Sequence, residues 1–421
     1  MGQEKQALLK KNEQIKKQLE ESSTQINDLA ADFLLRARLA EFNYQLGDQR
    51  IPTTQQYYEE ALELNYTPQY LCNYACFLQS EKKFDDAEKV FLDALPVCKN
   101  LAQNDLATYL PGVAIILTNL GSIASHKVSR RDQAEAYYCE SIEIFLELTK
   151  NNIDNYRADE AGTRTNLGLL ISDDRNRFDE ARKLFEDAIK ICRDVHNKIK
   201  SGKALYAAAA AINNLCNILI QKDRNLYFDS IERLLNEALK MYESLLTNNQ
   251  DRYYQSDKAL VLRNLGNLVA SDSRRNRHGE AERIHHKALK FQRELAENNP
   301  EVYLPEVGLT LRYLGNLVAL ERDRRKEAEE FLQEALDIYR KLAKSNPHEY
   351  LAEVANTLEL LGGVNMHWKQ PQKALRYFRE SGKLYSFLTQ QDPSVFSERL
   401  KINKLHIQDA IGIAANERKK E

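Results

Sequence analysis

Residues able to do chemistry are few and widely separated in this sequence. No phosphate-binding GxxxxGK[ST] loop, GxSxG nucleophile motif or HExxH metal motif occurs in its 421 residues. Three histidines lie close together, at His278, His285 and His286. Successive residues of a helix point about 100° apart, so His285 and His286 are poorly placed to hold one ion. We therefore expect no enzyme activity, no metal and no other cofactor.

The cysteines favour a reduced compartment. Of six, Cys72 and Cys76 are four residues apart and share a helix face, but no second pair lies near them to complete a metal site. Buried reduced thiols are the simpler interpretation, as is usual in the cytosol. The N-terminal MGQEKQALLKKNEQ lacks the apolar core of a signal peptide, and no run of 18 apolar residues occurs. The sequence thus predicts a cytoplasmic protein that does not span a membrane.

Arginines gather in the polar segments between apolar helical runs. Aligned along one edge of a repeated fold, they would form a basic rim able to bind phosphate or nucleic acid. Aspartates such as Asp132, Asp173 and Asp272 lie in the same segments, and the formal net charge of the chain is −2. Nucleic-acid binding is therefore not expected to be strong. The arginines concerned are Arg130, Arg131, Arg175, Arg177, Arg224, Arg274, Arg275, Arg277, Arg322, Arg324 and Arg325.

An internal repeat organises the elements that position these residues. The segment LRNLGNLVA at Leu262–Ala270 returns as LRYLGNLVA at Leu311–Ala319. Its small residue recurs every 46 to 50 residues, and a second small residue in the following helical run gives the same period after a first step of 33. Both runs have apolar residues three and four apart, which predicts helices. The two series are Ala75, Gly121, Gly168, Cys216, Gly266, Gly315, Gly362, and Ala61, Ala94, Ser141, Ala188, Ala238, Ala288, Ala335, Ser381.

The second helical run of each unit resembles the tetratricopeptide repeat family. Its signature is alanine, a large apolar residue four positions later and a small residue after seven, as in Ala87, Phe91 and Ala94. Because most intervals exceed the common family length of about 34, the resemblance is to the long-repeat branch, as in kinesin light chains and bacterial signalling proteins. It covers roughly residues 28–390. It implies an all-α, right-handed α-solenoid of about eight helical hairpins.

In that family the first helix of each unit lines a concave, peptide-binding face. Residues three before and one after the repeated small residue are four apart and share one side of that helix. The resemblance implies a groove in which asparagines contact a peptide backbone and arginines contact its carboxylates. Tyr313 stands where a chaperone-type carboxylate clamp would have a second asparagine, so the chain departs from that clamp. The candidates are Asn213, Asn217, Arg263, Asn264, Asn267, Arg312, Tyr313 and Asn316; Gly363 takes the last position in the series.

The two ends are expected to differ from the repeats. Residues 1–27 predict a long N-terminal helix, and a heptad spacing runs from Leu8 through Asn12 to Phe33. Two interpretations are open: this helix forms a homodimer through residues 8–33, with Asn12 fixing the register, or it folds back and caps the first repeat. Residues 28–391 hold the eight repeats. Residues 392–421 predict a C-terminal capping helix with a charged tail, its apolar face being Leu400, Ile402, Leu405, Ile407 and Ile411.

These features predict a non-catalytic scaffold that binds a protein or peptide segment, with acidic residues, in the groove of the superhelix. One alternative is a nucleic-acid- or phosphate-binding platform that uses the arginine-rich edge, which a steep salt dependence of binding would reveal. Another is a sensor or regulatory arm of a larger bacterial signalling or defence protein. The repeat predicts the fold, but a fold does not by itself imply a function. The function has to be argued from the residues of the site.

Overall fold

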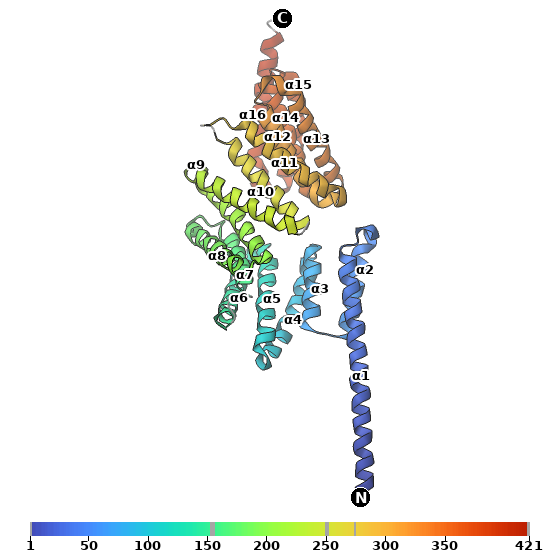
Figure 1. Ribbon diagram of the computed structural model, residues 1–421. Helices are drawn as coiled ribbons and strands as arrows, with labels where there is room; N and C mark the ends of the chain where they lie inside the picture. Colours follow the sequence, from blue (N-terminus) through green and yellow to red (C-terminus); the bar gives the residue numbers. More distant parts are fainter. Residues whose placement is uncertain (1, 152–155, 249–251, 273–274, 419–421) are drawn as a thin grey trace. The chain divides into compact units, whose positions relative to one another are not determined.

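The chain folds into helices that pack in consecutive pairs. The computed structural model describes residues 2–151, 156–248, 252–272 and 275–418, and no strand occurs among them (Figure 1). By their internal contacts these residues form two compact units, Met1–Ile218 and Leu219–Glu421, called here the first and second unit. The all-α fold of helical hairpins predicted from the repeat is confirmed.

The first unit contains four complete hairpins. In the last three, a first helix that carries the repeated small residue packs against a second helix that carries the alanine signature, and in the first α1 packs against α2. Short 3₁₀ turns connect some of them: η1 (Tyr44–Gln49), η2 (Val128–Arg130) and η3 (Arg175–Arg177). The helices are α1 (Gly2–Glu41), α2 (Arg50–Leu64), α3 (Pro68–Ser80), α4 (Phe84–Asn104), α5 (Leu106–Ser125), α6 (Arg131–Asn151), α7 (Arg157–Ile171) and α8 (Phe178–Ile199).

The fifth pair is a single long helix, α9 (Gly202–Asn248), with the boundary between the units inside it. Asp223 interrupts α9 with an extended backbone (φ −164°, ψ 97°), at the place where the other repeats have a turn. Three further hairpins and a last helix follow. They are α10 (Arg252–Ala270), α11 (His278–Asn298), α12 (Pro300–Val318), α13 (Arg325–Ser345, after the 3₁₀ turn η4, Arg322–Arg324), α14 (Pro347–His367), α15 (Pro371–Gln391) and α16 (Pro393–Arg418).

Each repeated glycine is a point of close contact between the two helices of its hairpin. In the second helix, the large residue four positions after the alanine lies directly on the glycine. A Cβ added at Gly121 would stand 2.7 Å from the Tyr138 ring, and one at Gly266 would stand 2.8 Å from the His285 ring. Such distances are far below normal carbon contacts, so only glycine fits. The same pairing joins Gly168 with Phe185, Gly315 with Leu332 and Gly362 with Phe378.

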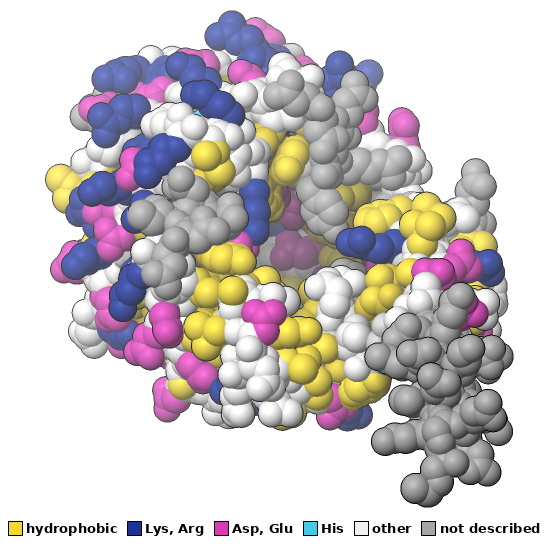
Figure 2. Space-filling view, turned by 60° about the horizontal axis from the view of Figure 1, so that its bottom comes forward, with side chains coloured by type: hydrophobic (Ala, Val, Ile, Leu, Met, Phe, Trp, Pro, Cys, Tyr) yellow, Lys and Arg dark blue, Asp and Glu magenta, His cyan; other side chains and the backbone are white. Residues whose placement is uncertain are grey.

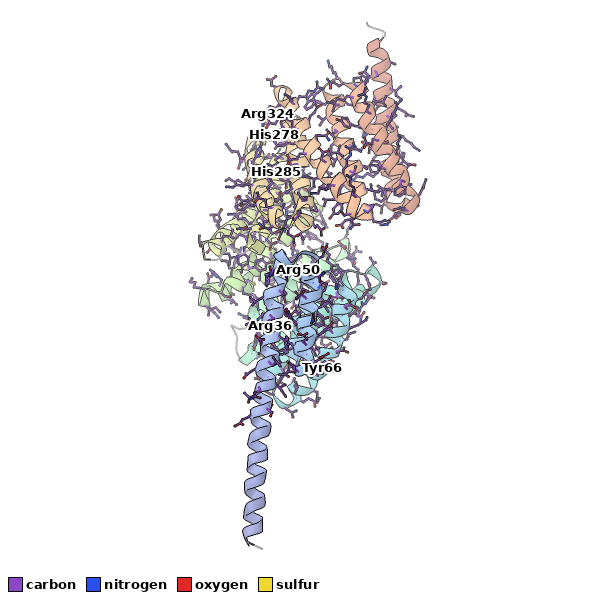
Figure 3. The ribbon with its side chains drawn as sticks, turned by 90° about the vertical axis from the view of Figure 1, so that its right-hand side faces the viewer. Arg36, Arg50, Tyr66, His278, His285 and Arg324 are labelled. Atoms are coloured by element: carbon purple, nitrogen blue, oxygen red, sulfur yellow. The ribbon has the colours of Figure 1, made fainter. Side chains whose placement is uncertain are left out.

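The N-terminal helix extends past residue 27 into the first repeat. Helix α1 is continuous from Gly2 to Glu41, and its C-terminal half packs on α2 through the buried Ala30 and Ala37. The part of α1 that packs on α2 ends where α2 ends, near a hydrogen bond of 3.0 Å from Asn65 Nδ2 to Asn27 Oδ1. Beyond that point α1 extends away from the rest of its unit (Figures 1 and 3). The heptad side chains before residue 21 lie outside the described residues.

The last helix covers the final repeat with a different face from the one expected. Residues at spacings of three and four from Leu400 face the core, and these include the buried Asn403 and Ala410. Ile402 and Leu405, expected on that face, are 40% and 52% exposed. The apolar residues of this helix lie on two of its sides, so apolarity alone does not identify the buried side. The buried side includes the polar Asn403, which an apolar pattern leaves out.

Two helices are long and apolar enough to cross a membrane by length and composition, Leu106–Ser125 and Gly202–Thr247. About half of each apolar window, 44% and 56%, is buried within the fold. Core helices of helical arrays meet the same criterion, because neighbouring helices cover them on several sides. The apolarity of these two helices is therefore accounted for by packing.

Candidate partner-binding face

The expected groove residues fall in both units, so they form two separate sets. Asn213 and Asn217 lie on α9 within the first unit, where Asn213 is buried and Asn217 half-buried, and both have interactions inside the fold. The other six residues lie on α10 and α12 of the second unit. The site can therefore be built only from the set on α10 and α12, with α14 and α16 beside it.

Arg263 is part of the fold rather than of an open surface. Its side chain is 10% exposed and forms an ion pair with Glu306 of the next first helix, α12. Burial lowers the pKa of the Arg263 guanidinium from its usual range, because a charge is costly away from water. Arg263 shares the groove side of the first helix by its spacing, but its side chain is packed within the fold. Truncating it would affect the packing as well as any ligand.

Arg312 repeats the same contact one repeat later. It pairs with Glu353 of α14 and lies 5.9 Å from the centre of the Tyr339 ring. One step further, Glu359 of α14 accepts hydrogen bonds from Asn403 and His406 of α16. Successive first helices are thus joined by a polar contact at each step. A ligand carboxylate would have to compete with Glu306 and Glu353 for the two arginines.

The asparagines are better placed for a partner than the arginines. Asn316 is exposed and Asn267 is half-buried, each one residue after its packed glycine. Asn264 is half-buried and has interactions within the fold. Tyr313 is 37% exposed and stacks on the His285 ring at 5.7 Å, with 10° between the ring planes. The side chains that face outward on α10 and α12 are therefore amides and one aromatic ring.

A cavity of about 530 Å³ adjoins this set of residues at the C-terminal end of the second unit. Arg312 and Asn316 line it from α12. Sequence reasoning missed its other walls, which come from α14, α15 and α16. Gly363, already visible as the residue that replaces asparagine in the repeat series, was the available signal. The missed polar or aromatic lining residues are Asn356, Glu359, His367, Tyr385, Arg399 and His406.

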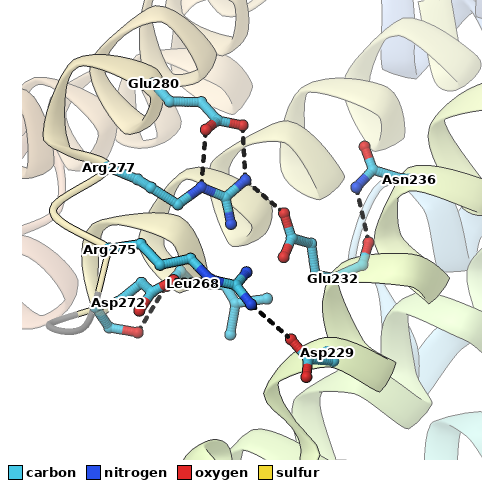
Figure 4. Close-up of polar contacts among 9 residues, drawn as sticks. Asp229, Glu232, Asn236, Leu268, Asp272, Arg275, Arg277 and Glu280 are labelled. Atoms are coloured by element: carbon cyan, nitrogen blue, oxygen red, sulfur yellow. Dashed lines mark hydrogen bonds and ion pairs between the residues drawn. The ribbon is translucent and has the colours of Figure 1, made fainter.

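The arginines of the turns form a second regular structure. Arg277 donates to Glu280 one turn ahead and to Glu232 of the preceding second helix, at 2.6 to 2.8 Å (Figure 4). Arg177 and Arg324 make the same double contact, and Arg130 pairs with Glu88. These arginines link neighbouring repeats, so their charge is already matched.

The carboxylates respond as expected for matched charges. The hydrogen bond from Arg324 holds the pKa of Glu282 below its ordinary value, and that from Arg277 does the same for Glu280. On the face shown in Figure 2, Lys and Arg side chains lie among Asp and Glu side chains rather than in one basic patch. The turn edge is therefore a poor electrostatic match for a polyanion.

The histidine cluster is dispersed by the fold. His285 is buried on Gly266, while His286 is 46% exposed and has Nε2 3.7 Å from Glu282. Among the described residues no group of three or more His, Cys, Asp or Glu side chains is arranged to hold a metal ion. Figure 3 labels His278, His285 and Arg324 among the helices of the second unit.

Comparison with known proteins supports the repeat assignment. The tetratricopeptide repeat model matches residues 161–199 and 310–349. A solved Signal Transduction ATPase with Numerous Domains protein with a tetratricopeptide repeat sensor, from Pyrococcus horikoshii, aligns at 14% identity and a TM-score of 0.54. The alignment covers 86% of this chain and 48% of that protein, so the chain spans about half its length. No curated protein matches significantly.

Other solved structures are similar at lower scores. BtubC (BKLC) from P. vanneervenii aligns at 20% identity over 62% of this chain and 90% of its own, with a TM-score of 0.45. A tetratricopeptide repeat protein from Parabacteroides merdae aligns at 14% identity over 80% and 98%, with a TM-score of 0.34. At such identities likeness shows fold alone. The chain thus matches the tetratricopeptide repeat model at residues 161–199 and 310–349, and the packed glycines and the common period extend the same helical hairpin to the other repeats.

Proposed function

We propose that this protein is a non-catalytic interaction scaffold whose second unit binds a polypeptide segment along α10, α12 and α14. Tetratricopeptide repeats are generally protein-interaction or sensor modules. The observation that carries the proposal is an amide at the same position of successive first helices, half-buried at Asn267 and exposed at Asn316, beside a cavity of about 530 Å³.

The chemistry of these positions suits a main chain. An asparagine amide both donates and accepts, as a peptide group does, so amides one repeat apart match an extended segment. Tyr313 adds a partly exposed ring for apolar contact. We expect the segment to carry an acidic side chain, which would compete with Glu353 for the neighbouring Arg312, itself 16% exposed.

The nucleic-acid alternative loses its support. It needs arginines able to displace counterions from phosphates, whereas Arg130, Arg177, Arg277 and Arg324 are each held by glutamates of the fold. The likeness to the Pyrococcus protein concerns the fold and adds no argument for a sensor role.

The proposal predicts that the double variant Asn267→Ala, Asn316→Ala binds a partner at least tenfold more weakly than the parent. A partner is first captured with the intact chain and then titrated, as a purified protein, by calorimetry. Each lost amide contact is worth about 0.5–1.5 kcal/mol, and about 1.4 kcal/mol is tenfold in affinity. The melting temperature should stay within a few degrees, since both amides lie outside the apolar core.

The matched control is Asn236→Ala with Asn298→Ala, two exposed amides on the second helices α9 and α11. It removes the same groups from another surface and should leave affinity unchanged. If the control loses binding while the groove variant keeps it, the partner uses the second helices and the proposed face is wrong.

We also propose that two copies pair through residues 8–33 of α1. The heptad stripe continues past the end of α2, and Ile26 and Leu29 on its described part are 45% and 47% exposed. An isolated helix of this length is only marginally stable in water, so a partner helix would account for it. A polar residue such as Asn12 within the stripe fixes register in paired helices.

Ile15→Asp with Leu19→Asp should convert a dimer into a monomer in sedimentation equilibrium, because two charges would enter the seam. The control variant Lys10→Asp with Lys17→Asp introduces two aspartates at positions outside the heptad stripe. It should leave the dimer intact. A parent chain that is already monomeric at about 50 µM, a concentration at which micromolar dimers persist, would show that α1 does not pair.

A further inference from the structure

The cavity of the second unit exists because one repeat position lacks a side chain. Gly363 occupies the place that Asn267 and Asn316 have on the preceding first helices. A Cβ built on Gly363 meets no atom within 4 Å, whereas one on the adjacent Gly362 would overlap the Phe378 ring. The space above Gly363 is therefore open, while the helix beneath it is tightly packed.

Aliphatic side chains form one part of the walls of this space. Leu360 and Val364 line it from α14, Leu320 follows α12, and Ile402 comes from α16. Leu320 is 56% exposed and Ile402 40% exposed, so apolar surface faces water at the rim of the cavity. Covering such surface is favourable at about 25 cal/mol per Å². An aliphatic side chain matches these walls.

The charges around the cavity are unequal. Its lining carboxylate, Glu359, is already engaged by His406 Nδ1 at 2.9 Å, by Asn403, and by Ser381 Oγ at 3.3 Å. Arg399 on α16 also lines the cavity, is exposed, and forms no salt bridge or hydrogen bond within the described part of the chain. The site therefore offers one cation that no protein carboxylate neutralises.

Arg399 is carried by a firmly held helix. One turn on from it, Asn403 is fully buried and donates to Glu359 and to the Phe378 carbonyl oxygen. Two other residues of α16, Phe396 and Leu400, pack on the cluster that contains the buried Tyr385. A charged group on such a rigid element loses little freedom on binding. Helix α16 is thus a wall of the cavity as well as the cover of the last repeat.

We propose that this cavity binds an acidic polypeptide segment by one aliphatic side chain, which enters the space above Gly363, and one carboxylate, which pairs with Arg399. This rests on the proposed interaction function and locates its anchor point on α16. In this proposal Arg263 and Arg312 stabilise the packing of successive repeats, and Arg399 forms the ion pair with the partner.

The experiment uses the full chain and a panel of fluorescein-labelled nonapeptides. Each has a central leucine or serine and four flanking aspartates, serines or lysines, and binding is measured by fluorescence anisotropy. We expect the acidic leucine peptide to bind with a Kd below about 1 mM, which is weak but measurable. The leucine-to-serine change and the acid-to-lysine change should each weaken it at least tenfold.

Two variants remove the two halves of the site. Gly363→Trp fills the open space, and Arg399→Glu reverses the charge; each should weaken the acidic leucine peptide at least tenfold. Arg399→Glu should also bind the lysine peptide better than the parent does. Gly363→Ala and Arg379→Glu, the latter at an exposed arginine of α15 that does not line the cavity, should leave affinity unchanged. Circular dichroism should show parental helical content for all four variants, with none of them melting well below the parent.

The proposal is overturned if no peptide of the panel binds, if serine and leucine peptides bind equally, or if free glutarate binds as tightly as the peptide, which would indicate a small-molecule site. It also fails alone if a captured partner loses affinity for the Asn267→Ala, Asn316→Ala variant but not for Gly363→Trp or Arg399→Glu. If none of these variants affects the partner, the proposed interaction face fails as well.

Discussion

Gly362→Ala is expected to destabilise the protein, and Gly363→Ala, at the next residue of the same helix, is expected not to. A Cβ on Gly362 would overlap the Phe378 ring, and that ring is only 2% exposed and has no room to retreat. Overpacking of this kind costs about 1–3 kcal/mol, against a gain of about 1 kcal/mol from replacing a helical glycine by alanine. Gly363→Ala has no overpacking cost and should show only the gain in helix propensity.

The two variants should therefore differ by about 1–3 kcal/mol in the free energy of unfolding, because the helical gain is common to both and only Gly362→Ala has the overpacking cost. Thermal unfolding followed by circular dichroism gives the order directly: Gly362→Ala lowest, then the parent, then Gly363→Ala. Equal melting temperatures for the two variants would mean that the Phe378 ring has room to move away from Gly362.

The pairs of helices could be predicted from the sequence because their contacts are local and repeated. Glycine in the first helix and a large residue in the second helix, such as Gly168 with Phe185, belong to one hairpin and recur in hairpin after hairpin. Because the small residues of the first and the second helices recur with the same period, the sequence indicates which faces of the two helices are in contact. The same logic placed Asn316 outward, because the position after a packed glycine has turned away from the partner helix.

The partners of the charged residues could not be predicted in the same way. Spacing shows that Arg263 and Arg312 share a face, but not that Glu306 and Glu353, some forty residues later, stand opposite them. Those contacts depend on how one repeat stacks on the next. A polar residue on the face of a first helix is therefore as consistent with a link between repeats as with a ligand contact.

The cavity at Gly363 needed the structure for another reason. It requires a missing side chain in the repeat and a wall from α16, a helix outside the repeat pattern. The sequence assigned α16 a covering role through its apolar residues, whereas a buried polar residue, Asn403, decides how the helix is turned. Its rotation brings Arg399 to the cavity.

His285→Phe is expected to stabilise the protein and to remove part of its sensitivity to acid. His285 is 1% exposed, and burial, with the nearby Arg263 and His286 charges, lowers its pKa from the ordinary 6.5 to about 4. The unfolded chain therefore binds a proton between these values and the folded chain does not. The contribution is complete above pH 6.5 and is lost as the pH falls toward 4.

Lowering the pH from 7.5 to 5 should thus cost the parent about 2 kcal/mol through His285 alone, at about 1.4 kcal/mol for each pH unit below 6.5. Phenylalanine fills the equivalent position as Phe91, Phe185 and Phe378, so the hairpin accepts it and loses a buried polar ring. The unfolding free energy of His285→Phe should fall less steeply over this range. His286→Asn, at the exposed neighbour, should keep the parental slope; an unchanged slope in His285→Phe would place the acid sensitivity in the glutamates held by the turn arginines instead.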